Sequence, residues 1–287
     1  MDKSVKNFNV RLRTIRLREL IVGIIITIII SIVLMTIFPV LEESDDLFFI
    51  VFLLIGALMF VWALRGTRGL ETDFENLFTD NNKKEILYVF LTNILFAFLI
   101  TFLISYIDIL IGMSDPTWIS MWDVETVDMD SSMLILDAIG AIIFAPIMEE
   151  LVFRGVIFNR LKIRTGIVPA MIISSFIFAI GHDFGGITSA FLFGICMCIL
   201  YLKTDNILIP MSVHFINNVV ATVLSITGLD IIISQLPWLI PFSIISVIGT
   251  IYLIKYIIQE CKSLKKQYSC RISQSDCSLL LSSEPIV

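Results

Sequence analysis

Apolar stretches long enough to cross a bilayer dominate this sequence. Of its 287 residues, 57% are hydrophobic and only 16% are charged, whereas a soluble domain usually carries about 25% charged residues. A membrane-spanning helix needs about 20 consecutive apolar residues. Eight stretches approach that length, at roughly residues 19–40, 47–64, 86–112, 132–158, 166–184, 186–203, 206–227 and 238–258. The sequence therefore predicts an all-α, polytopic membrane protein with about eight transmembrane helices.

The basic residues are distributed along the chain in a way that predicts its orientation. All 20 Lys and Arg residues lie within 1–18, 65–84, 154–164 and 255–271 or at Lys203. The intervening loops, of which the longest is expected at 113–131, contain none. Because Lys and Arg are enriched on the cytoplasmic side of a membrane, we expect both ends of the chain to be cytoplasmic. Compact loops and the lack of an organelle address favour a prokaryotic plasma membrane.

This pattern divides the chain into three expected parts. Residues 1–18 are a basic cytoplasmic N-terminus, and residues 19–258 form the transmembrane helical domain. Residues 259–287, which are rich in Ser and Lys, are expected to be a mobile cytoplasmic tail. The motifs that carry chemistry all lie within 130–227.

Small residues recur on one face of the predicted span 186–203. Ala190, Gly194 and Cys198 follow one another at intervals of four, which places them on the same side of a helix. Small side chains allow two membrane helices to approach closely. We therefore expect this face to pack against another helix, either in the same molecule or in a second copy.

The span 132–158 carries ionisable residues, which are costly in a membrane and usually functional. Glu150 and Arg154 are four residues apart, so they share a helical face, and we expect them to form an ion pair. Glu149 is left without a local partner and is the better candidate for a general base. Pro146 removes a backbone hydrogen bond just before these residues and is expected to kink the helix. The alternative is a polar helix end, with all three charges near the headgroups.

Both histidines of the chain, His182 and His214, also fall within predicted spans. His214 and Asn218 are four residues apart on one helical face. Two polar donors on one face are typical of an oxyanion hole, and equally of contacts that join membrane helices. His182 has a simpler interpretation as an interfacial residue in a turn. Three separate spans with such groups predict an intramembrane active site.

The order and spacing of these residues resemble a known family. Glu149-Glu150-x-x-x-Arg154, Phe178-x-x-x-His182 and His214-x-x-x-Asn218 are similar to the three motifs of the CAAX-processing and bacteriocin-processing (CPBP, Abi) endopeptidases. These are the type II CAAX prenyl endopeptidases and their prokaryotic relatives. The resemblance covers about residues 130–227, and it implies a glutamic intramembrane protease.

The resemblance also implies a role for each motif residue. Glu149 is the general base, and His182 helps to orient and activate the water. His214 and Asn218 hold the oxyanion, while the ion pair four residues apart supports the site structurally. The expected substrate is a membrane-associated peptide or protein, lipidated or not, and no nucleic acid. No metal or other cofactor is expected.

Three other interpretations of the same residues remain open. Glu149, His182 and His214 are also a two-His, one-carboxylate set that suits zinc, although the chain has no H-E-x-x-H motif. The polar cluster also fits a non-catalytic scaffold or a bacteriocin-immunity protein that binds a peptide. Buried Glu and His also occur in transporters and proton relays, but no internal repeat supports that interpretation.

Overall fold

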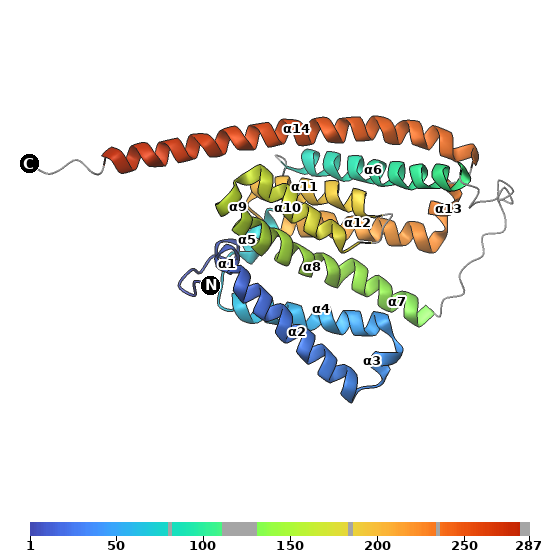
Figure 1. The fold of residues 1–287 in the computed structure, drawn as a ribbon, viewed down its shortest axis with the longest axis horizontal. Coiled ribbons are helices and arrows are strands. Elements are labelled where there is room, and N and C mark those ends of the chain that lie inside the picture. The colour runs from blue at the N-terminus through green and yellow to red at the C-terminus, as the bar shows by residue number, and fades with distance from the viewer. Residues whose placement is uncertain (80–81, 111–130, 183–185, 234–235, 282–287) are drawn as a thin grey trace, which may run out of the picture.

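Helices make up the computed structural model, which describes residues 1–79, 82–110, 131–182, 186–233 and 236–281. In chain order the elements are α1 (Phe8–Thr14), α2 (Leu17–Ile37), α3 (Val40–Glu43), α4 (Asp45–Leu64), α5 (Leu70–Glu75), α6 (Lys83–Leu110), α7 (Ser131–Ile139), η1 (Gly140–Phe144), α8 (Ala145–Glu150), η2 (Leu151–Phe158), α9 (Asn159–Thr165), α10 (Ile167–Ile180), α11 (Ile187–Thr204), α12 (Leu208–Thr227), α13 (Leu229–Ile233) and α14 (Leu236–Leu281). Figure 1 shows α2 and α4 at one edge of the bundle and α6 with α14 at the opposite edge. The motif-bearing helices lie between these two pairs.

Six of the described helices are long and apolar enough to cross a membrane. They are Leu17–Ile37, Asp45–Leu64, Lys83–Ile104, Ile187–Thr204, Leu208–Thr227 and Trp238–Gln267. The other two predicted spans, 132–158 and 166–184, are also largely helical. The second of them contains α10, a shorter apolar helix of 14 residues. The motif-bearing span is an unbroken series of five short segments, from α7 to α9. The prediction of an all-α, multi-pass membrane protein is confirmed, and the count of eight crossings stays a prediction.

The C-terminal part of the chain is more helical than the sequence led us to expect. α14 does not end near residue 258 but continues to Leu281, and it extends past the rest of the bundle (Figure 1). No Gly or Pro occurs between residues 259 and 281 to end the helix. The mobility of this tail stays a prediction. The expected loop 113–131 lies outside the described residues, apart from its last residue.

Basic segments that are distant in sequence meet at one end of the bundle. Arg13 forms an ion pair with Asp205, which lies in the turn after α11. Arg160, at the start of α9, donates through Nε to the backbone oxygen of Ile15 at 2.6 Å. The charge pattern predicted that these segments share one side of the membrane. That this side is the cytoplasmic one stays a prediction.

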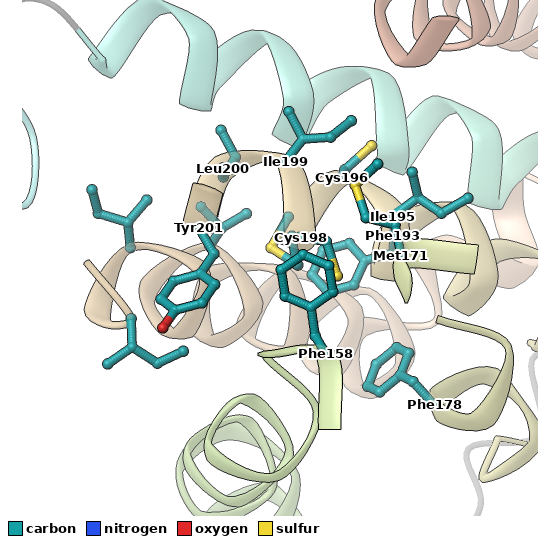
Figure 2. Close-up of a cluster of buried hydrophobic side chains, with 14 of the residues drawn as sticks. Phe158, Met171, Phe178, Phe193, Ile195, Cys196, Cys198, Ile199, Leu200 and Tyr201 are labelled. Carbon is teal, nitrogen blue, oxygen red and sulfur yellow. The ribbon is translucent and has the colours of Figure 1, made fainter. Parts of the chain in front are cut away.

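The small-residue face of α11 packs within the molecule. Ala190, Gly194 and Cys198 are all buried, and a Cβ atom placed on Gly194 would lie 2.9 Å from the Cβ atom of Ser175 on α10. Larger side chains of α11, together with Phe158 and Met171 from neighbouring helices, complete a buried cluster around it (Figure 2). Of the two partners that the sequence allowed, α10 of the same chain is the one in contact.

Replacing Gly194 with alanine tests this close approach. We expect Gly194→Ala to lower the free energy of unfolding by about 1–3 kcal/mol, because the added methyl group overpacks the contact with α10. Gly23→Ala on α2 is the matched control, since nothing lies within 4 Å of its Cβ position. Denaturation of both variants in mixed micelles measures the difference. Equal stability of Gly194→Ala and the unmodified protein would contradict the close approach.

Candidate active site

The two glutamates lie on a helix that changes its backbone hydrogen-bond register on both sides. α8 is flanked by the π-helical segments η1 and η2. Wider turns of this kind alter which carbonyl groups are paired inside the helix, and they occur frequently at functional sites. Side chains bind the carbonyl groups of η2. Ser174 Oγ donates to the Phe153 oxygen at 3.2 Å, and Asn159 Nδ2 donates to the oxygens of Arg154 and Gly155 at 2.8 and 3.1 Å.

Pro146 explains the contact that Asn218 makes. The Ala145 N–H bonds to the Gly140 oxygen, five residues earlier, as in a π-helix. In the same register the next donor would be Pro146 and its acceptor the Ala141 oxygen, but proline has no N–H. Asn218 Nδ2 donates to that oxygen at 2.7 Å instead. One Nδ2 proton of Asn218 therefore joins α12 to the motif helix. The same nitrogen carries a second proton that is not used in this hydrogen bond.

Glu150 is held in the interior by two partners. Arg154 Nη1 donates to Glu150 Oε1 at 2.8 Å, so the predicted ion pair is present. His214 Nδ1 approaches the same oxygen at 3.0 Å. These three side chains are at most 4% exposed. An ionised carboxylate only accepts hydrogen bonds, so this contact with ionised Glu150 requires a proton on Nδ1 of His214. The guanidinium group also stacks over the Phe178 ring, at 4.4 Å from its centroid.

Glu149 has a different environment from its neighbour. Its side chain is 28% exposed, whereas that of Glu150 is fully buried. Glu149 Oε2 lies 3.6 Å from His214 Nε2, so the imidazole ring stands between the two carboxylates. Glu149 also lines an open cavity of about 780 Å³, whose other lining residues lie on α2, α4, α8, η2 and the segment before α2. Of the two carboxylates, Glu149 is therefore the one that a bound molecule can reach.

Aromatic rings place the second histidine near this cluster. His182 Nδ1 lies 3.1 Å from the Phe178 backbone oxygen, and the two rings are 4.7 Å apart. The Phe178 ring also meets His214 edge-on at 5.9 Å, and Phe193 does so at 5.1 Å; both phenylalanines are labelled in Figure 2. The Phe178 ring therefore lies between His182 and His214 and contacts both. The structure thus gathers the motif residues of three helices in one place, with Asn218 one turn further along α12.

Several features of this site had no clear signal in the sequence. The contact between His214 and Glu150 joins residues 64 positions apart, and Phe193 lies in a run of apolar residues without a motif. The cavity depends on α2 and α4, which carry no polar motif.

Among the described residues, no three His, Cys, Asp or Glu side chains are grouped so that they could hold a metal ion.

Comparisons with known proteins agree with the motif pattern. Residues 131–220 match the family described as type II CAAX prenyl endopeptidase Rce1-like. The chain is 31% identical over 106 residues to the putative membrane peptidase YdiL of Bacillus subtilis (strain 168), covering 34% of this chain and 43% of that protein. It is 37% identical over 83 residues to the membrane-embedded CAAX protease MroQ of Staphylococcus aureus (strain USA300), covering 26% and 34%.

The matches confirm the family resemblance in the region that holds the site. They span less than half the length of these two relatives. No solved structure matches the chain significantly.

The buried ion pair predicts a large effect of mutation on stability. We expect Arg154→Ala to lower the free energy of unfolding by about 3–5 kcal/mol, because it leaves the Glu150 carboxylate buried without its cation. Arg164→Ala is the control, since that side chain is exposed at the end of α9. Unfolding of the purified protein in mixed micelles measures both variants. A change below about 1 kcal/mol in Arg154→Ala would rule out a structural role for the pair.

Proposed function

We propose, from the match of residues 131–220 to the Rce1-like type II CAAX prenyl endopeptidase family, that this protein is an intramembrane endopeptidase of the glutamic type. It hydrolyses a peptide bond of a membrane-associated peptide or protein. The observation that carries this proposal is the unequal placement of two adjacent carboxylates around His214. Glu150 is buried with Arg154, while Glu149 faces the cavity. One carboxylate is thus held in a structural role and the other is available for chemistry.

In the proposed reaction Glu149 is the general base. It takes a proton from a water molecule as the water oxygen attacks the carbonyl carbon of the substrate, and the carbonyl oxygen becomes an oxyanion. When the intermediate collapses, the C–N bond breaks and the protonated Glu149 gives its proton to the leaving amine. His182 helps to position the water, since its ring packs against Phe178, which also contacts His214.

His214 and Asn218 are the proposed donors to the oxyanion. A donor aimed at the developing negative charge is typically worth about 100- to 1,000-fold in rate. His214 Nδ1 already faces Glu150, so donation from Nε2 requires the imidazolium form, which carries N–H groups on both nitrogens. Asn218 contributes the amide proton that is not bound to the Ala141 oxygen. In this proposal Glu150 acts indirectly, because it fixes the imidazole ring of His214, which donates to the oxyanion.

The class of substrate follows from the place of the site. Glu149 faces a cavity that is lined mainly by aliphatic and aromatic side chains, between helices that expose apolar residues. A substrate that reaches this cavity is itself membrane-associated. A lipid attached to the peptide fits the apolar lining. Both relatives carry names that denote membrane peptidases.

Glu149→Gln tests the catalytic proposal, because it keeps the shape and polarity of the side chain but removes the base. We expect the rate of cleavage to fall by about 100- to 10,000-fold, with the fold unchanged by thermal unfolding in detergent. Proteomics of membranes that contain the unmodified protein or this variant should reveal a precursor that accumulates only with the variant. If the variant keeps the full biological effect, the protein is a scaffold or binding protein rather than a peptidase.

Removal of metal ions separates the glutamic mechanism from a zinc mechanism. We expect cleavage of the accumulated precursor to continue at the same rate after treatment with 1,10-phenanthroline and dialysis. A zinc-bound water would require His182 and His214 as ligands, whereas His214 contacts both carboxylates in this structure. Loss of cleavage that zinc alone restores would replace the glutamic mechanism with the metal-dependent one.

A further inference from the structure

The cavity beside Glu149 is lined by residues of the motif helix, of α2 and α4, and of the segment before α2. Met148, Glu149, Val152 and Phe153 line it from the motif helix. Most of the other lining residues lie on α2 and α4, and Gly56 on α4 is among them. Its volume of about 780 Å³ falls within the range of roughly 300–1,000 Å³ that is usual for ligand sites. On the proposed function, this cavity holds the part of the substrate next to the cleaved bond.

Met148 is the cavity residue whose position depends most directly on a glycine. A Cβ atom placed on Gly56 would lie 2.6 Å from the terminal methyl group of Met148 and 3.5 Å from its sulfur. The end of the Met148 side chain therefore occupies the space that the missing Cβ leaves. Methionine is flexible at this end, so a larger residue at position 56 would displace the methyl group rather than the helix. Met148 lines the cavity, so its methyl group can move into that open space.

We propose that Met148, seated against Gly56, sets the size of the apolar side chain that this cavity accepts beside Glu149. This inference rests on the proposed function, since it concerns the substrate of the same site. Met148 directly precedes Glu149 in the sequence, and both residues line the cavity. An extended peptide advances by about 3.3–3.6 Å per residue. A side chain next to the cleaved bond therefore falls in the part of the cavity that Met148 limits.

Three variants change this space in known directions. Met148→Ala removes the end of the side chain and enlarges the cavity beside Glu149. Gly56→Ala pushes the Met148 methyl group into the cavity and makes it smaller. Ile147→Ala is the matched control, because Ile147 lies next to Met148 on the same helix but is 38% exposed and does not line the cavity. Size-exclusion chromatography and thermal unfolding verify that all three are folded.

The first measurement needs no substrate. Glu149→Cys, in a chain with Cys261, Cys270 and Cys277 replaced by serine, is labelled in proteoliposomes with N-methylmaleimide or with the larger N-pyrenylmaleimide. The remaining thiols, Cys196 and Cys198, are fully buried. We expect Met148→Ala to raise the large-to-small ratio of labelling rates about tenfold, and Gly56→Ala to lower it, relative to Ile147→Ala. Equal ratios in all three would overturn the inference.

The second measurement uses cleavage in the chain that retains Glu149. Internally quenched apolar peptides in proteoliposomes, with each position varied among Ala, Val, Leu and Phe, report kcat/KM as a function of side-chain size. One added methylene group is typically worth about 10- to 200-fold in such a pocket. We expect Met148→Ala to shift the preference toward Phe by at least tenfold, and Gly56→Ala to shift it toward Ala.

The two measurements separate the failure of the inference from the failure of the proposed function. An unchanged size preference, with cleavage that still depends on Glu149, overturns the role of Met148 and leaves the peptidase proposal standing. Cleavage that persists in Glu149→Gln overturns the peptidase proposal. In that case the maleimide ratio still decides the role of Met148 in limiting the cavity.

Discussion

Burial of a charged cluster inside an apolar helical bundle is the constraint on which the rest of this structure depends. An isolated ionised group in such an environment costs several kcal/mol, so a buried charge needs a partner with good geometry. Glu150 has two partners on one oxygen, Arg154 at 2.8 Å and His214 at 3.0 Å. Arg154 in turn stacks on Phe178. This fixed cluster orients His214 so that its other nitrogen faces Glu149, the carboxylate that opens to the cavity.

The backbone of the motif helix is adapted to the same need. Two π-helical segments flank α8 and change the backbone hydrogen-bond register on either side of it. The cost of such turns is carbonyl groups without a helical donor, and side chains of other helices supply donors to them. Asn218 donates a hydrogen bond to the backbone oxygen of Ala141, where Pro146 has no N–H to do so. Ser174 donates to the backbone oxygen of Phe153. Asn218 therefore joins two helices, and its proposed role toward the oxyanion depends on the second proton of the same amide.

The sequence predicted those parts of the molecule that depend on local pattern. The apolar spans and the segregation of Lys and Arg follow from the bilayer itself, and the pairing of Glu150 with Arg154 follows from helical spacing alone. The three motifs were sufficient to identify the helices that meet. The sequence could not predict the contact of His214 with Glu150, because it depends on how two distant helices face each other. It also gave no sign of the π-helical turns or of the cavity that α2 and α4 complete, since the walls of that cavity are ordinary apolar residues.

Nuclear magnetic resonance of the His214 ring tests the central arrangement most directly. The chain has two histidines, so ¹⁵N-histidine labelling gives few signals, and a spectrum of His182→Gln assigns those of His214. Because the ionised Glu150 carboxylate can only accept a hydrogen bond, we predict a proton on Nδ1 of His214, in either the neutral ring or the imidazolium. A neutral ring that carries its proton only on Nε2 would contradict the arrangement, since Glu150 would then not hold the ring between the two carboxylates.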